Sequence, residues 1–132
     1  MTTTTSALES PAQQVKPWGY EVIFADGSAG YVGKVIHVAQ GHALSLQYHV
    51  SKTETMHVIS GVGIVEVGPD EHSLEERTVS AGDTIHIEAG TVHRMIALSD
   101  LVFVEASTAT PGWREDVVRL RDDYGRGGTT TP

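Results

Sequence analysis

Apolar and polar residues alternate along most of this chain in short runs that are rich in β-branched side chains. A period of two is typical of strands that bury one face, since successive strand residues point to opposite sides. Turn-forming pairs such as Asp26-Gly27, Ser60-Gly61 and Ala89-Gly90 separate the runs. The predicted strands are Tyr20–Phe24, Val32–Ala39, Leu44–His49, Thr55–Ser60, Gly63–Val67, Arg77–Val79, Thr84–Glu88, Val92–Ala97, Leu101–Ala106 and Val117–Leu120.

Many short strands without a long amphipathic helix predict an all-β domain. The expected closure is a double-sheet jelly roll or a small barrel, because closure protects strand edges from pairing with other chains. Both ends of the chain differ in composition, with Thr, Ser, Ala and Gln at the start and Gly and Thr at the finish. We therefore expect a flexible N-terminal arm over residues 1–16, which could instead form a strand on a partner copy, one domain over 17–126 and a flexible C-terminal tail over 127–132.

Composition narrows the chemistry and the partners. The 132 residues include no cysteine, so any metal ligand must be His, a carboxylate or an amide oxygen. The formal net charge of -8 argues against a nucleic-acid partner, which normally selects a basic surface. No apolar run approaches the length needed to span a bilayer, and the first residues lack the pattern of a secretory signal. We expect a soluble, cytoplasmic protein that binds neither nucleic acid nor a membrane.

Four side chains are candidate metal ligands. Gln47 and His49 are two residues apart, so on a strand they point to the same face, and Glu54 can join them after the turn that follows. His93 comes from a distant hairpin, in the sequence Gly-x-x-His. A carboxylate and two imidazoles inside an apolar barrel would be costly without a partner ion. The expected cofactor is a divalent metal, such as zinc, manganese, iron or nickel.

Two longer motifs contain these residues. The first reads GHALSLQYHVSKTE from Gly41 to Glu54, and the second reads GDTIHIEAGTVH from Gly82 to His93. Both resemble the motifs of the cupin superfamily, and the LSLQ-x-H variant resembles the mannose-6-phosphate isomerase (type II) cupin domain. The likeness extends to Lys16–Glu21 and to Glu115–Arg126. It implies a cupin double-stranded β-helix, the jelly-roll barrel, with the four residues above as metal ligands.

The resemblance also indicates residues that could act on a substrate. Lys52 stands where an Arg follows the His ligand in the isomerases, and His86 stands where related sequences often carry an aromatic residue. Both are candidate general bases or proton shuttles, although the sequence leaves open whether His86 points inward. Lys34 and Arg126 are candidates for orienting an anionic or hydroxylated substrate. Met56 replaces a Trp that is usual in the isomerases, so the substrate is expected to differ.

The reaction that the resemblance implies is a metal-dependent aldose-ketose isomerisation of a sugar or sugar phosphate. Two alternatives remain open, because a fold does not fix a function. The same site could serve a lyase, decarboxylase or dioxygenase of another small metabolite, or a non-catalytic module that holds a metal and a small effector. Strands near the chain ends, Val15–Phe24 and Val117–Leu120, are expected to pair two copies into a homodimer.

Overall fold

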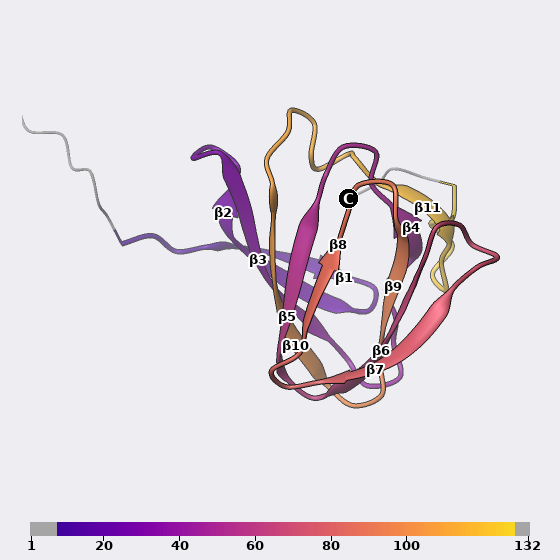
Figure 1. Cartoon of the computed structure of the whole chain (residues 1–132). Helices are drawn as coiled ribbons and strands as arrows, with labels where there is room; N and C mark the ends of the chain where they lie inside the picture. Colours follow the sequence, from indigo (N-terminus) through magenta and orange to yellow (C-terminus); the bar gives the residue numbers. More distant parts are fainter. Residues whose placement is uncertain (1–7, 129–132) are drawn as a thin grey trace, which may run out of the picture.

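The structure is a computed structural model that describes residues 8–128, so the predictions for residues 1–7 and 129–132 lie outside it. Its strands form two antiparallel sheets, with the orders β1-β2-β3-β10-β5-β8 and β11-β4-β9-β6-β7 (Figure 1). None of the described elements is a helix long and apolar enough to cross a membrane. The strands are β1 Ala12–Lys16, β2 Gly19–Asp26, β3 Tyr31–Val38, β4 Leu46–Tyr48, β5 Glu54–Ser60, β6 Val62–Gly68, β7 Glu75–Ser80, β8 Thr84–Ile87, β9 Val92–Ala97, β10 Leu101–Thr108 and β11 Val118–Arg121.

The ten predicted strands are all present, with ends that differ from the prediction by at most two residues. The strand that the pattern did not predict is β1, which lies inside the expected flexible arm. It pairs antiparallel with β2, from Ala12 opposite Ile23 to Lys16 opposite Gly19. Trp18, in the turn between the two strands, is buried in the core of its own chain.

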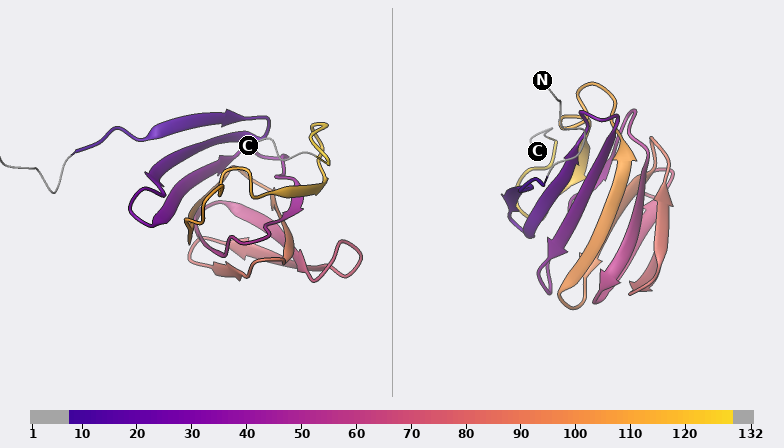
Figure 2. Two further views of the ribbon diagram at one scale, coloured as in Figure 1. Left: turned by 90° about the horizontal axis from the view of Figure 1, so that it is seen from above. Right: turned by 90° about the vertical axis from the view of Figure 1, so that its left-hand side faces the viewer.

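The two sheets face each other as the layers of a jelly roll, and the six-stranded sheet lies in front in the right-hand view of Figure 2. Inward residues change in character along the strands. On β10, Leu101 and Phe103 belong to the buried apolar cluster, whereas the next inward residue along the strand is Glu105. On β5, Val58 lies in the same cluster and Glu54 is buried at the opposite end of the strand. The barrel therefore has an apolar end and a polar end.

The turn between β5 and β6 shows why the chain needs glycine at one of the predicted breaks. Gly61 has φ of 88°, a left-handed backbone conformation that other residues adopt at a cost. A Cβ atom at this position would lie 2.0 Å from the carbonyl oxygen of Asp100. Glycine therefore lets the β5–β6 turn pass directly beside the turn that precedes β10.

Candidate metal centre

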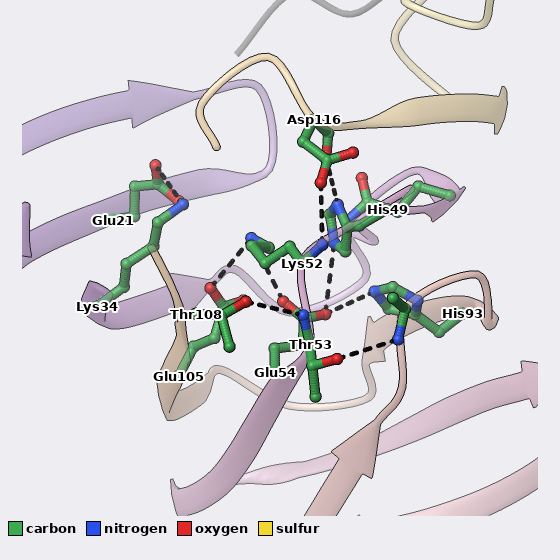
Figure 3. A network of polar contacts seen from close by, with 12 residues as sticks. Glu21, Lys34, His49, Lys52, Thr53, Glu54, His93, Glu105, Thr108 and Asp116 are labelled. Carbon is green, nitrogen blue, oxygen red and sulfur yellow. Dashed lines mark hydrogen bonds and ion pairs between the residues drawn. The ribbon is translucent and has the colours of Figure 1, made fainter. Parts of the chain in front are cut away.

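His49, Glu54 and His93 meet at the polar end of the barrel (Figure 3). His49 directly follows β4, Glu54 begins β5 and His93 lies on β9. One ligand atom from each residue lies within 4.8 Å of the other two. The three residues are 5%, 2% and 4% exposed, so the cluster is shielded from bulk water. The structure thus brings together three of the four predicted ligands as one buried group.

Hydrogen bonds fix how the two imidazoles are turned. Nδ1 of His49 lies 2.6 Å from the carbonyl oxygen of Asp116, and Nδ1 of His93 lies 2.9 Å from that of Thr91. Because a carbonyl oxygen only accepts, each Nδ1 carries the hydrogen and donates it. In the neutral ring this leaves a lone pair on Nε2, the arrangement that orients a histidine toward a metal ion.

Both lone pairs point at one carboxylate. The Oε1 atom of Glu54 lies 2.8 Å from Nε2 of His93 and 3.5 Å from Nε2 of His49. The two Nε2 atoms and Oε2 of Glu54 are buried without a hydrogen-bond partner. Lone pairs that face one another away from water are unfavourable unless a cation or a shared proton lies among them. A donor set of two imidazole nitrogens and a carboxylate fits a borderline divalent ion such as zinc, manganese, iron or nickel.

The carboxylate is held in its ionised form. Burial raises the pKa of Glu54, but the contacts with His49 and His93 and the charge of Lys52 outweigh this, and the pKa lies well below its ordinary value. The same carboxylate raises the pKa of His93 against the opposing effect of burial. A proton shared between His93 and Glu54 would compensate the buried charge, and metal binding would compete with that proton.

Gln47, the fourth predicted ligand, lies beside the cluster. It pairs with His93 across strands β4 and β9, and it lines the same pocket as His49. Its Oε1 atom accepts a hydrogen bond of 2.8 Å from the hydroxyl of Ser45. A carbonyl oxygen has a second lone pair, so this bond orients the amide and leaves it able to act as a ligand.

Asp116 is a residue of the candidate site that the sequence analysis did not single out. Its carboxylate accepts hydrogen bonds from the backbone N–H groups of Val50, Ser51 and Lys52, at 2.7, 3.0 and 2.9 Å. Although burial raises the pKa of Asp116, these hydrogen bonds lower it below its ordinary value. Because its carbonyl also holds His49, one residue fixes both the ligand and the turn after it. The signal available in the sequence was that Asp116 lies within Glu115–Arg126, one of the segments that resemble the cupin family.

Lys52 is buried between two carboxylates. Its Nζ atom lies 3.5 Å from Oε2 of Glu54 and 3.5 Å from Oε2 of Glu105. Burial lowers the pKa of Lys52, but Glu105 and Glu54 outweigh it and the net shift is upward. The side chain is therefore an ammonium ion, which suits it to donate a hydrogen bond or a proton; of its two predicted roles, proton shuttle and general base, this form fits the first better.

Glu105 is a second residue that the sequence analysis missed. It points inward from β10 and lines the pocket. Burial and the neighbouring charge of Glu54 raise its pKa, against the opposing effect of Lys52 and Lys34. The only signal in the sequence was a carboxylate at an inward position of an otherwise apolar strand.

The pocket above the cluster is rich in cations. It contains Lys34 and Arg126, the two candidates for substrate binding. Each forms an ion pair, with 3.3 Å between Lys34 Nζ and Glu21 Oε1 and 3.0 Å between Arg126 Nη2 and Asp122 Oδ1. Its wall includes Trp113, with Lys34 Nζ 5.2 Å from the ring centroid. The lining residues are Gln14, Lys16, Trp18, Glu21, Lys34, Ile36, Leu44, Ser45, Gln47, His49, Lys52, Glu105, Trp113, Arg114, Asp116, Val117, Arg119 and Arg126.

His86 points away from this site. Its position on β8 is opposite Thr55, on the outer face of the sheet, and its side chain is 54% exposed. Nδ1 lies 2.9 Å from the hydroxyl of Thr55, and Nε2 lies 2.8 Å from Oε1 of Glu88. The orientation that the sequence left open is therefore outward, and the structure does not bring His86 to the metal ligands.

Two curated relatives align with most of this chain. The Xanthan biosynthesis protein XanB of Xanthomonas campestris pv. campestris is 32% identical over 114 residues, which are 84% of this chain and 23% of that protein. A mannose-1-phosphate guanylyltransferase of Salmonella muenchen is 29% identical over 112 residues, which are 83% of this chain and 22% of that protein. The chain thus spans less than a quarter of the length of these relatives.

Solved structures share the fold. The capsular polysaccharide assembling protein CapF from Staphylococcus aureus superposes with a TM-score of 0.73 at 18% identity, over 91% of this chain and 37% of that chain. Oxalate decarboxylase from Bacillus subtilis superposes with a TM-score of 0.72 at 17% identity, over 83% of this chain and 30% of that chain. The family model described as cupin domain matches residues 34–106, more than half of the sequence. The all-β jelly roll, its two motifs and this match show that the chain belongs to the cupin family.

Proposed function

We propose that this cupin is a metal-dependent enzyme that acts on a small anionic molecule, and that the reaction is the aldose-ketose isomerisation of a sugar phosphate. One observation carries the proposal. A buried His-Glu-His cluster that fits a divalent ion lies beside a pocket in which the cations of an acidic chain are concentrated.

The charge of the pocket is opposite to that of the chain. Six of the nine Lys and Arg residues line it, against three carboxylates, whereas the formal net charge of the whole chain is -8. A cleft of one sign inside a molecule of the other sign concentrates ligands of matching charge. Guanidinium and ammonium groups bind phosphate through charge-assisted hydrogen bonds. The name of one relative refers to mannose 1-phosphate, which supports a sugar phosphate over other anions.

The residues around the cluster suit a proton transfer between neighbouring carbons. A divalent ion held by His49, Glu54 and His93 would supply Lewis-acid polarisation of a substrate carbonyl and its adjacent hydroxyl. The Lys52 ammonium can donate a hydrogen bond to the oxygen on which negative charge develops. Glu105, which lines the pocket 3.5 Å from Lys52 Nζ, can accept a substrate proton and return it.

The test combines metal analysis with an isotope-exchange assay. Protein purified without added metal is analysed for its elements and then incubated with a panel of aldose and ketose phosphates in deuterium oxide. Isomerisation through an enediolate places deuterium on the carbon that receives the proton, which NMR detects. Replacing one ligand, His49→Gln, is expected to lower kcat/KM by at least roughly 100-fold, as for the loss of a group that stabilises the developing charge.

The matched control is His86→Gln, because His86 lies on the outer face. We expect this variant to retain the activity. A protein that binds a sugar phosphate and metal but turns over no member of the panel would contradict the isomerase and identify a binding module.

The second candidate is a decarboxylase or lyase of a small carboxylate. The cation-lined pocket favours it, because a carboxylate makes the same charge-assisted hydrogen bonds as a phosphate. Release of carbon dioxide from a small dicarboxylate, with no isomerisation of sugar phosphates, would establish this reaction in place of the first.

A further inference from the structure

Trp113 is a pocket residue to which the proposed function gives no role. It lies in the segment that connects the two sheets between β10 and β11, drawn from orange to yellow in Figure 1. The chain has only two tryptophans, and the other, Trp18, belongs to the buried core. Trp113 is half-buried and forms part of the pocket wall. Its ring therefore has a surface to offer to a ligand or to neighbouring side chains.

Two cations lie against this ring. The Nζ atom of Lys34 is 5.2 Å from the ring centroid, and the guanidinium carbon of Arg114 is 4.5 Å from it. Both distances are within the range at which the electron-rich face of a tryptophan attracts a cation. Both cations also line the pocket. Trp113 therefore holds together two like charges that would otherwise repel each other.

The position of the ring is set by contacts with the backbone. Gly27, in the turn between β2 and β3, has φ of 93°, and a Cβ atom there would lie 2.9 Å from Nε1 of Trp113. The glycine thus lets the ring pack directly against this turn. The segment that carries the ring is fixed by a backbone hydrogen bond of 3.1 Å from the Trp113 N–H to the carbonyl of Thr110. The ring is therefore in place before any ligand arrives.

The positive charge beside the ring is only partly neutralised. Lys34 contacts both oxygens of Glu21, at 3.3 and 3.4 Å, but Glu21 is shared with Lys16. Among residues 8–128, Arg114 forms no ion pair. An ammonium has three donors and a guanidinium has five, so both side chains can still donate to a ligand. Two such donors, held close together in one pocket, suit an anion.

We propose that Lys34, Trp113 and Arg114 form an anion subsite, in which Trp113 is a positioning residue that holds the two cations ready for one oxyanion group. The cations make the charge-assisted hydrogen bonds, and the ring offsets their mutual repulsion while the subsite is empty. The identity of the ligand rests on the proposed function, which supplies a phosphate. The subsite itself rests on the contacts around the ring.

The subsite is separated from the candidate metal centre by one strand. Lys34 lies on β3 directly opposite Glu105 of β10, and β10 pairs in turn with β5, which begins at Glu54. In Figure 3, Lys34 lies on the far side of Lys52 and Glu105 from His93. Two strand spacings amount to roughly 10 Å. The ligand therefore has its anionic group at the end remote from its reacting carbons, with Lys52 and Glu105 between the two.

The test is the affinity of the full chain for sulfate, measured by calorimetry at low ionic strength. Trp113→Leu keeps an apolar side chain but removes the aromatic face, and it should lower the affinity roughly 3- to 10-fold. Trp113→Phe keeps a smaller ring and should retain more of the affinity than Trp113→Leu. Acetate is measured in parallel, and the ion that binds more tightly identifies the anionic group as a phosphate or a carboxylate.

A double-mutant cycle separates positioning from a structural role. With Arg114→Gln as the second change, the loss caused by Trp113→Leu should shrink, because one of the two cations that the ring holds is gone. The matched control is Phe24→Leu, at an exposed ring on β2 that does not line the pocket, and it should bind sulfate as the wild type does. Circular dichroism establishes that each variant is folded. Equal sulfate affinity in the wild type and Trp113→Leu, or losses at Trp113 and Arg114 that simply add, would overturn the proposal.

Sulfate binding does not require turnover, so the subsite and the isomerase fail separately. An inactive protein whose sulfate affinity depends on Trp113 would retain the subsite and lose only the proposed reaction. In an active isomerase, Trp113→Leu should raise KM for the sugar phosphate with little change in kcat, because a remote charge is bound equally in the ground state and the transition state. A fall in kcat with unchanged KM would contradict the subsite.

Discussion

At the scale of single residues, the positive charge in the pocket exceeds what its acids neutralise. Glu21 is shared by two lysines, with its Oε1 atom 3.3 Å from Lys34 Nζ and 3.9 Å from Lys16 Nζ. Burial, together with the charges of Lys34, Arg119 and Arg126, lowers the pKa of Lys16 to about 8 against the opposing effect of Glu21. The Lys16 ammonium in the pocket therefore loses its proton more easily than an ordinary lysine. An anionic ligand in the pocket would raise the pKa of Lys16 again.

We predict that an anion bound in the pocket raises the pKa of Lys16. The anion favours the charged ammonium, so by linkage its affinity falls as the pH rises through about 8. Sulfate is the suitable probe, because its charge is constant in this range. NMR titration of the lysine side-chain signals, with and without sulfate at low ionic strength, measures the shift. Lys16→Gln should weaken sulfate binding and flatten its pH dependence around pH 8, and an unchanged pKa of Lys16 at saturating sulfate would contradict the prediction.

The ligands could be found from the sequence because their chemistry is local. Gln47, His49 and Glu54 lie within one short stretch, and His93 follows a turn glycine. Asp116 could not be found in the same way, since its contact with His49 joins residues 67 apart in the chain. The direction of His86 depends on which residue of β5 it faces, and that register is set by the whole sheet.

At the scale of elements, the segment between β10 and β11 closes one side of the site. It supplies Trp113 to the pocket wall and Asp116 to the turn after β4. The three backbone N–H groups that donate to the Asp116 carboxylate belong to consecutive residues, so a single side chain satisfies most of the turn. The geometry of His49 therefore depends on a segment distant in sequence. A substitution in that segment should alter the affinity of the site for its metal.

Asp116→Asn is predicted to weaken metal binding, although Asp116 is not one of the candidate metal ligands. The amide has one acceptor oxygen in place of two, so part of the turn loses its hydrogen bonds, at a cost of about 1–3 kcal/mol in unfolding free energy. Loss of an outer partner of a ligand typically lowers metal affinity by roughly 10–100-fold. Calorimetric titration with zinc or manganese measures the affinity, and urea unfolding measures the stability.

Asp83→Asn is the matched control for this substitution. Asp83 accepts a hydrogen bond of 2.8 Å from the backbone N–H of Ser80 in a turn between β7 and β8. We expect a loss of stability with unchanged metal affinity. Equal metal affinity in the wild type and Asp116→Asn would show that the segment does not position His49.

Strand β1 shows where a prediction of elements from sequence fails. Ten strands were predicted because each alternates apolar and polar residues, but in β1 Gln13 and Gln14 interrupt that pattern. The strand owes its place to the backbone pairing with β2 and to the buried Trp18 in the turn between them. Backbone hydrogen bonds of an edge strand leave little trace in side-chain chemistry, so composition suggested a flexible arm.

At the scale of the whole molecule, the candidate metal centre joins the two layers of the jelly roll. Glu54 belongs to the six-stranded sheet, whereas His93 and the residue before His49 belong to the five-stranded sheet. The apolar core holds the layers together through the rest of the barrel. An ion bound by all three residues would therefore link the layers at the end where the core is replaced by buried charges.

We predict that a divalent metal raises the melting temperature of the full chain and that a chelator lowers it. A ligand present at 100 times its Kd adds about 2.7 kcal/mol to the free energy of unfolding when only the folded state binds it. In a domain of this size that corresponds to roughly 10 °C, measured by scanning calorimetry with and without the metal. Glu54→Gln and His93→Gln should abolish the response, whereas Glu76→Gln, an exposed change on β7, should retain it. A melting temperature that neither metal nor chelator alters would show that the buried cluster is held by its proton alone, because no cation then stabilises the folded chain.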